Sequence, residues 1–350
     1  MLPEKPPEFV VAEGNPPLTS IVTLTPAPVL DRTYIVDKLR QGEVNRASEV
    51  YEYLSGKGLS VARTLHLAQR PVSAVLPIGK DDEHLLSRTP YPQILRMLPV
   101  DGRIRVNTSV VEAEGRTTNI NQEAVPMSDS DWSRVCELTI EQLETMDADW
   151  LVVSGMHPLN TDTGDFVELE GLFQRARELG ARTAVDTSGA NLGRWGRSPL
   201  VNLLKPNADE LARLAGHDLY TIGDAVDAAQ ELCTLGIEIA LVSLGADGAL
   251  AVTENEALWA HAAPTTVRNT TGAGDAVLAG FIASSQPSGK AAGIREPLDI
   301  PSGLATAVSW GALAVSLPTT LISSFENAPT AVVEQPDRDR PLSEPTHLPT

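Results

Sequence analysis

Short apolar segments of strand-like composition alternate along this chain with longer segments whose apolar residues recur at helical spacing. The longer segments include residues 130–146, 169–180 and 221–236, and the last two end in glycine, which is typical of a helix C-terminus. This alternation predicts an α/β fold with a mostly parallel sheet and helices on both faces. The strand-like segments lie at residues 20–25, 72–79, 149–155, 182–189, 202–207 and 239–245.

Glycine-containing or polar motifs close several of the strand-like segments. These are SG at 154–155, DTSG at 186–189, KPN at 205–207 and SLG at 243–245. The carboxyl ends of parallel strands form one edge of a sheet, and ligands bind at that edge. We therefore expect the functional site to lie there.

Two regions and the two ends of the chain depart from this pattern. Residues 32–54 and 103–121 alternate apolar with polar residues, which predicts a small antiparallel β lid with a solvated face. The ends, residues 1–18 and 326–350, are rich in proline and charge, which predicts disorder. The folded domain is thus expected to span residues 19–325.

Composition excludes several classes of function. The formal net charge is −19, and no cluster of Lys and Arg appears, which opposes nucleic-acid binding. No apolar run is long enough to cross a bilayer, and the first residues do not resemble a signal peptide, so we expect a cytoplasmic protein without a membrane partner. Cys136 and Cys233 lie far apart in sequence, which argues against a disulfide framework or a structural zinc site.

The stretch NTTGAGDAV at residues 269–277 precedes an apolar, helix-like run. Gly272 and Gly274 leave the backbone bare, so amides at the start of the helix could bind an anion with help from the helix dipole. Asp275 lies inside this cradle. It either acts on a ligand held there or only caps the helix, and the motif alone leaves both interpretations open.

The stretch SGKGLSVARTL at residues 55–65 offers a cation between two glycines. It is not a Walker P-loop, because no Ser or Thr follows Lys57 directly. Gly56 and Gly58 would permit close backbone approach to a substrate. An ordinary turn into a helix is the alternative.

Two later motifs could serve a nucleotide. In KPNADEL, Asn207 and Glu210 would share the first turn of a helix and could hold a hydrated Mg²⁺, or could simply form a capping box. In VSLGADGALAV at residues 242–252, the backbone of a glycine-rich turn could contact a nucleotide, or the segment could be a simple hairpin.

The order of these motifs resembles that of the ribokinase-like (PfkB) carbohydrate kinases, whose signature (D/N)TxGAGD corresponds to NTTGAGD. The resemblance extends from about residue 21 to about residue 320. The segments TLTPAPVLDRTY, LRQGEVNR, RVN at 105–107 and GLATAVSWGALAVSLP are most similar to the branch that phosphorylates sugar phosphates, which includes 1-phosphofructokinase and tagatose-6-phosphate kinase. The resemblance implies a three-layer α/β/α ribokinase-like kinase domain with a small β lid.

The implied reaction is transfer of the γ-phosphate of ATP to a ketohexose phosphate, with fructose 1-phosphate as the expected acceptor and fructose 1,6-bisphosphate as the product. Asp275 would be the general base, with a low pKa because it lies at a helix N-terminus. Gly272, Ala273 and Gly274 would form an anion hole for the transferring phosphoryl group. The lid would cover the sugar and exclude water.

The resemblance also assigns binding residues, and it implies a homodimer because family members often pair through their lids. The expected cofactors are ATP and Mg²⁺, with Mg²⁺ held near Asn207 and Glu210 through water. The residues implied for the sugar phosphate are Asp31, Gly56, Lys57, Ser60 and Arg105, and those implied for the nucleotide are Lys205, Asn207, Glu210, Ser243, Gly245 and Gly248.

The chain departs from the family pattern on the acceptor side. Ser55 replaces a glycine, and Ser60 replaces an asparagine that usually contacts the sugar. The motif SGMHPLN places Met156 and His157 where Ser and Leu are expected, and His157 could contact the acceptor or lie in a surface loop. The alternatives are a weakly catalytic, sugar-phosphate-binding regulatory protein and a kinase of tagatose 6-phosphate, fructose 6-phosphate or a free sugar.

Overall fold

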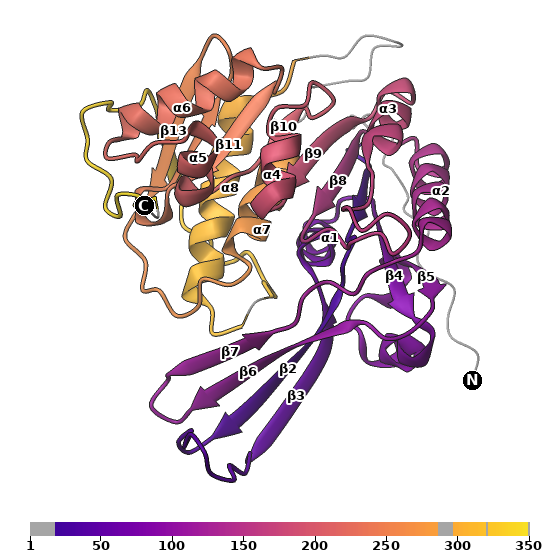
Figure 1. The fold of residues 1–350 in the computed structure, drawn as a ribbon. Helices are drawn as coiled ribbons and strands as arrows, with labels where there is room; N and C mark the ends of the chain where they lie inside the picture. Colours follow the sequence, from indigo (N-terminus) through magenta and orange to yellow (C-terminus); the bar gives the residue numbers. More distant parts are fainter. Residues whose placement is uncertain (1–17, 286–296, 320, 349–350) are drawn as a thin grey trace.

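The computed structural model describes residues 18–285, 297–319 and 321–348 of the 350-residue chain. All but the last residue of the predicted N-terminal extension, 1–18, lie outside the described residues. Within the described part, a large sheet is enclosed between two layers of helices, and a small second sheet projects from one end (Figure 1). The predicted three-layer α/β/α arrangement is confirmed.

The large sheet is parallel from β11 to β5 and antiparallel from β11 to β14. Strand β1 lies between β4 and β8, so the chain builds the sheet outward from β1 in one direction and then in the other. A ligand crevice is expected at such a switch point, beyond the carboxyl ends of the strands. In spatial order the strands are β14 (Ala331–Glu334), β13 (Ala257–Ala262), β12 (Ala249–Val252), β11 (Ile239–Ser243), β10 (Leu203–Leu204), β9 (Arg182–Asp186), β8 (Trp150–Ser154), β1 (Ile21–Leu24), β4 (Val72–Gly79) and β5 (Leu95–Val100).

The helices divide between the two faces of the sheet. One face is covered by α1 (Lys57–Leu67), α7 (Ala273–Ser284) and α8 (Ile300–Ser316). The other is covered by α2 (Asp129–Thr145), α3 (Glu170–Glu178), α4 (Gly189–Trp195), α5 (Ala208–Ala215) and α6 (Ile222–Thr234). Three short 3₁₀ segments, η1 (Lys80–Arg88), η2 (Pro92–Ile94) and η3 (Gly245–Asp247), complete the connections.

The small sheet corresponds to the two segments predicted to form a lid. Its strand order is β3 (Glu49–Ser55), β2 (Val29–Val36), β6 (Arg105–Glu112) and β7 (Thr117–Asn121). Strands β2 and β6 pair in parallel, and the outer pairs are antiparallel. Strand β2 begins shortly after β1 ends, and β3 ends just before α1 begins. The small sheet therefore meets the large sheet at the carboxyl ends of the large sheet's strands (Figure 1).

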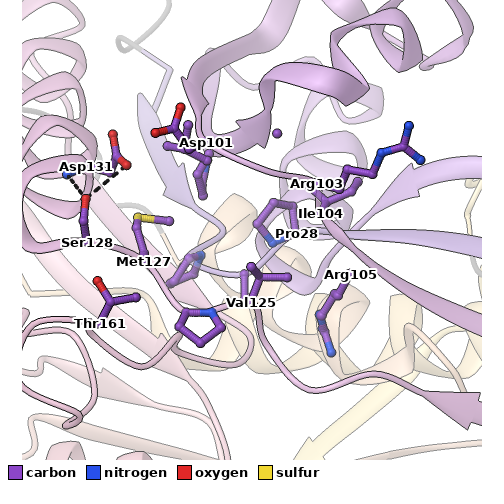
Figure 2. Close-up of a pocket in the computed structure, with 16 residues that line it drawn as sticks. Pro28, Asp101, Arg103, Ile104, Arg105, Val125, Met127, Ser128, Asp131 and Thr161 are labelled. Carbon is purple, nitrogen blue, oxygen red and sulfur yellow. Dashed lines mark hydrogen bonds between the residues drawn. The ribbon is translucent and has the colours of Figure 1, made fainter.

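A cavity of about 240 Å³ lies where the two sheets meet. Its walls come from residues 26–28 after β1, the end of β4, residues 100–105 and residues 125–128 before α2. Figure 2 shows Arg105 on one side of this space and Asp131 on the other. Arg105 therefore belongs both to the small sheet and to the wall of the cavity.

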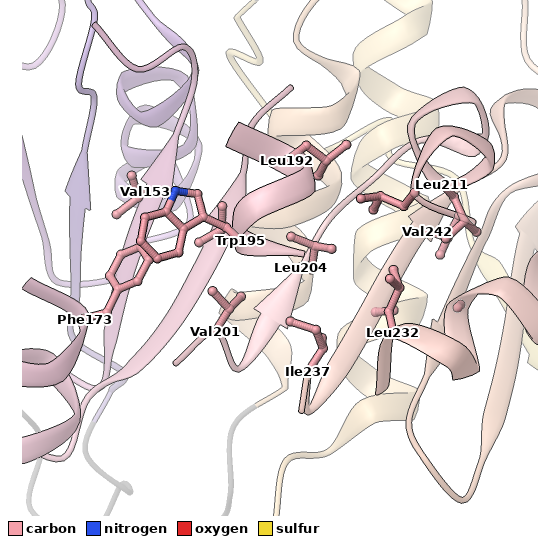
Figure 3. Packing of buried hydrophobic residues seen from close by; sticks show 14 of the residues in the cluster. Val153, Phe173, Leu192, Trp195, Val201, Leu204, Leu211, Leu232, Ile237 and Val242 are labelled. Carbon is pink, nitrogen blue, oxygen red and sulfur yellow. The ribbon is translucent and has the colours of Figure 1, made fainter. Parts of the chain in front are cut away.

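Buried apolar side chains fix the helices to the sheet. On one face, Phe173 from α3 and Trp195 from α4 meet edge to face, with ring centroids 4.9 Å apart (Figure 3). The same cluster continues through Leu204 of β10 and Leu232 of α6. This continuous core holds the carboxyl ends of neighbouring strands in register. None of the helices in the described part of the chain is long and apolar enough to span a bilayer.

The predicted disorder of residues 326–350 is wrong for the part that the structure describes. Strand β14 pairs with β13 at the edge of the large sheet. Beyond it, Leu342 and Thr346 are buried, with 5% and 2% of their surface exposed. The backbone amides of this segment find acceptors on distant residues, for example Leu342 on the carbonyl of Tyr220, so its proline-rich composition does not prevent a fixed course.

Candidate active site

Helix α7 begins inside the motif NTTGAGD and has no side-chain cap. Gly272 is the N-cap residue, with φ 85° in the left-handed region, and no side chain accepts a hydrogen bond from the first turn. The amide of Ala273 donates to the carbonyl of Thr270 at 3.3 Å. A Cβ at Gly274 would lie 3.1 Å from Nζ of Lys205, so glycine lets this cation approach the helix start. The first turn thus combines an uncapped helix end with a nearby cation, which suits an anion.

Asp275 is the third residue of α7, and only 7% of its surface is exposed. Burial and the nearby carboxylate of Asp186 raise the pKa of Asp275 to about 7, against the opposing effects of Lys57, Lys205 and a hydrogen bond from Ser60. The low pKa expected from the helix dipole is therefore wrong, because burial and a second carboxylate outweigh it. Since α7 has no side-chain cap, Asp275 does not serve as one.

Asp186 lies at the end of β9 and joins two lysines from distant parts of the chain. Its Oδ1 lies 3.1 Å from Nζ of Lys57, and its Oδ2 lies 3.6 Å from Nζ of Lys205. Burial alone would raise the pKa of Asp186, but the cations of Lys205 and Lys57 outweigh it and lower the pKa. Asp186 in turn raises the pKa of Lys57. Two cations and two carboxylates, including Asp275, therefore share one cluster. We call it the buried cluster because three of its four charged side chains are buried, whereas Lys57 is 45% exposed.

The glycines around Lys57 allow α1 to start against β1. A Cβ at Gly56 would lie 2.6 Å from Cγ2 of Thr25, and one at Gly58 would lie 2.8 Å from the carbonyl oxygen of Leu24. Gly56 also has a φ of 144°, which side chains rarely adopt. These two glycines therefore have a packing role that is independent of any ligand.

Asn207 and Glu210 form the capping box that the sequence left as one alternative. Oδ1 of Asn207 accepts from the amide of Glu210 at 2.8 Å, and Oε2 of Glu210 accepts from the amide of Asn207 at 3.0 Å. Glu210 contributes to the raised pKa of Lys57, which places its carboxylate within electrostatic reach of the cluster. Its Oε1 takes no part in the capping box.

A second group of polar side chains lies at the base of the small sheet. The pKa of Asp31 is raised by burial, while Ser55, Asn107, Arg105 and Arg63 oppose this shift. Strand register explains the grouping, because Asp31 lies opposite Asn107 on the neighbouring strand β6. We call Asp31, Ser55, Arg63, Arg105 and Asn107 the acceptor group, because the sequence predicts that Asp31 and Arg105 bind the acceptor. The group offers one carboxylate with two arginines nearby.

Arg105 connects the small sheet to the loop after β8. Its Nη1 donates to the carbonyl of Gln122 at 3.0 Å and to Sδ of Met156 at 3.2 Å, while its Nε is buried without a hydrogen-bond partner. A thioether is a weak acceptor, so it orients the guanidinium without competing strongly with an anion. Met156, one of the departures from the family pattern, therefore contacts a residue predicted to bind the substrate.

His157 is buried, so the alternative that places it in a surface loop is wrong. Only 2% of its surface is exposed. Burial lowers its pKa to about 4, and neither of its ring nitrogens has a hydrogen-bond partner among the described residues. Pro158, the next residue, is buried as well, so this part of the loop faces the protein interior.

Residues 243–248, which we call the nucleotide turn because the sequence predicts that they contact the nucleotide, connect β11 to β12 in a hairpin. The amide of Ser243 donates to the carbonyl of Pro206 at 3.1 Å, which places the start of the turn beside the KPN motif. Gly248 has a φ of 86°, and a Cβ there would lie 2.0 Å from the carbonyl oxygen of Ala260. Gly245 is exposed.

The structure brings six of the fifteen predicted site residues into two neighbouring groups. Lys57, Ser60, Lys205 and Asp275 belong to the buried cluster, and Asp31 and Arg105 belong to the acceptor group. Gly155 links them, because a Cβ there would lie 3.8 Å from Cβ of Lys57, and the next residue contacts Arg105.

The sequence prediction missed Asp186. Its only signal was the acid of DTSG at the end of a buried strand, on the edge where ligands were expected. The motif did not reveal that lysines from α1 and from the end of β10 would meet there.

The chain is similar to known proteins in sequence and in fold. A model of the pfkB family of carbohydrate kinases matches residues 24–291. The chain is 35% identical over 270 residues to a 1-phosphofructokinase of Haloferax volcanii, covering 76% of this chain and 84% of that protein. It is 30% identical over 306 residues to a 1-phosphofructokinase of Escherichia coli, covering 85% and 91%.

Solved structures show the same fold. Phosphofructokinase-2 from Escherichia coli, in its complex with potassium, superimposes with a TM-score of 0.74 at 25% identity, covering 89% of this chain and 97% of that one. The family model alone covers most of the chain, including the buried cluster and the acceptor group. This chain therefore belongs to the pfkB family of carbohydrate kinases.

Proposed function

We propose that this chain transfers the γ-phosphate of ATP to O6 of fructose 1-phosphate. The observation that carries the proposal is the buried carboxylate of Asp275, which lies at an uncapped helix N-terminus within reach of two lysines. The choice of acceptor rests on relatives named 1-phosphofructokinase, which are 28–35% identical to this chain.

In this proposal, Asp275 takes the proton of the O6 hydroxyl as that oxygen bonds to the γ-phosphorus. The bond between the γ-phosphorus and the β–γ bridging oxygen breaks, and ADP leaves. A carboxylate with a pKa near 7 suits a general base at neutral pH. Amides of Gly272, Ala273 and Gly274 would stabilise charge on the phosphoryl oxygens, and Lys205 would neutralise it.

On the acceptor side, Asp31 would accept hydrogen bonds from the sugar hydroxyls. Arg105 and Lys57 would contact the phosphate that the acceptor already carries. Arg105 suits this role because its buried Nε has no hydrogen-bond partner and Met156 orients its Nη1. Ser60, which hydrogen-bonds to Asp275, and Gly56 would line the space between them.

On the nucleotide side, the polyphosphate would lie along Lys205, Asn207 and the nucleotide turn, which includes Ser243, Gly245 and Gly248. Mg²⁺ keeps several waters and needs few protein ligands, so Oε1 of Glu210, which is outside the capping box, fits a water-mediated site. Bound there, Mg²⁺ would neutralise charge on the transferring phosphate. We also propose that the chain forms a homodimer through the outer face of the small sheet.

A panel of acceptors tests the proposal. ATP consumption and product mass are measured with fructose 1-phosphate, fructose 6-phosphate, tagatose 6-phosphate, fructose and ribose. The expected result is the highest kcat/KM with fructose 1-phosphate and formation of a bisphosphate. A better free sugar would contradict the role of Arg105, and binding of sugar phosphates without turnover would favour a regulatory protein instead.

A further inference from the structure

The segment after β14 follows a defined course over the nucleotide side of the molecule. We call residues 336–348 the C-terminal strap; Figure 1 shows the end of the chain running beside α6 and β13. Its backbone carbonyls at Arg338 and Arg340 accept from the amides of Gly223 and Ile222, both at 3.0 Å. The strap is thereby attached to the start of α6 before it reaches the nucleotide turn.

The strap binds the nucleotide turn at one buried carboxylate. Oδ2 of Asp247 accepts from the amide of Ser343 at 2.7 Å, and Oδ1 accepts from the Ser343 hydroxyl at 2.8 Å. Nη2 of Arg340 lies 3.7 Å from the same Oδ1. Asp247 is only 2% exposed, so losing these partners would leave a charge with little compensation from water.

Arg340 also joins the turn to the strand that supports it. Its guanidinium stacks 5.0 Å from the ring centre of Trp259, and Nε1 of Trp259 donates to the carbonyl of Asp247 at 2.7 Å. One network therefore holds the backbone and the carboxylate of Asp247 against β13, and the strap supplies the side chains of Arg340 and Ser343 to it.

The turn has little freedom to shift without affecting the buried cluster. Gly248 packs against the backbone of Ala260, and Ser243 hydrogen-bonds to Pro206, the residue after Lys205. A displacement at Asp247 would thus be transmitted along the turn to the segment that carries Lys205.

We propose that the C-terminal strap positions the nucleotide turn through Asp247, and that Arg340 and Ser343 are positioning residues for ATP binding. The inference rests on the proposed function, since it takes residues 243–248 to contact the nucleotide. In this arrangement the strap touches no substrate. It fixes the conformation that the turn must have when ATP binds, so its loss weakens ATP binding and leaves acceptor binding unchanged.

The test compares two arginines of the strap in the full-length chain. Arg340→Ala breaks the contacts with Asp247 and Trp259, whereas Arg338→Ala breaks only a two-bond ion pair with Asp227 of α6, at 2.6 and 2.7 Å. Ser343→Ala removes one hydroxyl, and Ser343→Thr retains it. ATP affinity is measured by calorimetry, with KM for ATP, KM for the sugar phosphate and Tm measured alongside.

We expect Arg340→Ala and Ser343→Ala to weaken ATP binding about tenfold, which corresponds to ~1.4 kcal/mol. Arg338→Ala and Ser343→Thr should bind ATP like the parent, and KM for the acceptor should be unchanged in all four. Unchanged ATP affinity in Arg340→Ala, or an equal loss in Arg338→Ala, would overturn the positioning role while leaving the proposed function intact. A parent protein that binds no ATP would overturn both.

Discussion

Asp275 is the residue on which the proposed chemistry depends most directly, and its substitution separates catalysis from capping. Asp275→Asn keeps the shape of the side chain but cannot take a proton, so kcat should fall at least ~100-fold while ATP affinity stays nearly unchanged. Asp299→Asn is the matched control, because Asp299 does cap its helix, accepting from the amide of Ser302 at 3.0 Å, and asparagine caps equally well. A variant at Asp275 that retained most of its turnover would contradict the role of base.

The raised pKa of Asp275 also predicts how activity and stability depend on pH. The base must be ionised, so kcat should rise through an acid limb near pH 7. Stability should change in the opposite sense, because the pKa of Asp275 in the folded protein is above its ordinary value of 3.8. The stability that Asp275 contributes is fully present below pH 3.8 and is lost as the pH rises through 7. Asp275→Asn should therefore raise Tm more at pH 8 than at pH 5, as thermal melts at the two pH values would measure.

Asp186 gives an independent test of the same cluster. Its carboxylate raises the pKa of Asp275, while Lys57 and Lys205 lower it. In Asp186→Asn the repulsion disappears and both cations remain, so the acid limb of kcat should move about one pH unit or more towards acid. An acid limb that stayed in place would mean that the group titrating there is not Asp275.

Met156 can be tested through its contact with Arg105. Met156→Leu preserves volume but removes the sulfur that accepts from Nη1, so KM for the sugar phosphate should rise about three- to tenfold and KM for ATP should not change. Met127→Leu in the cavity wall makes the same chemical change away from this contact. Equal effects of both variants would assign Met156 a packing role only.

At the scale of the elements, the pattern of apolar residues predicted strands correctly where the strand is fully buried. The segments at 72–79 and 149–155 are continuous apolar runs, and both form buried strands. The segment at 202–207 yields only Leu203–Leu204 as strand, because Pro206 has no amide to donate and the chain turns there towards α5. The C-terminal strap was missed because its partners, such as Tyr220 and Asp247, are remote in sequence.

The site residues also fall into those that a local motif reveals and those that depend on the tertiary fold. NTTGAGD and KPNADEL could be located from spacing, since each motif contains both a helix start and a candidate site residue. Asp186 could not, because its importance depends on which strands become neighbours. The pKa of Asp275 was mispredicted for the same reason, since the helix start is visible in the sequence but the burial and the second carboxylate are not.

The hairpin of β11 and β12 offers a prediction about an element. Gly248→Ala would place a Cβ 2.0 Å from the carbonyl oxygen of Ala260 at a φ of 86°, so the hairpin must shift. We expect the free energy of unfolding in urea to fall by about 3 kcal/mol or more. Gly216→Ala has a similar φ of 78° but open space around it, and should cost only ~1 kcal/mol. Equal losses would show that φ, rather than the close packing, determines the cost.

At the scale of the whole molecule, strand register divides the small sheet into two faces with different chemistry. Asp31, Asn107 and Asn121 are paired across neighbouring strands and share the inner, polar face. The outer face carries Val50 and Ile120, which are 51% and 64% exposed, together with the ion pair of Arg32 and Glu52. Large exposed apolar side chains on a projecting sheet are typical of a protein interface, which is why we place the proposed dimer there.

Charge on this outer face should separate the two subunits without changing the fold. Ile120→Lys would bury an unpaired cation at the interface and should raise the dimer dissociation constant roughly 30-fold or more, or ~2 kcal/mol. Val332→Lys, on β14 in the large sheet and 52% exposed, makes a comparable change away from this face and should leave the assembly intact. Sedimentation velocity over a range of concentrations would measure both. If the parent sediments as a monomer throughout, or if Ile120→Lys assembles like the parent, the subunits do not associate through the small sheet.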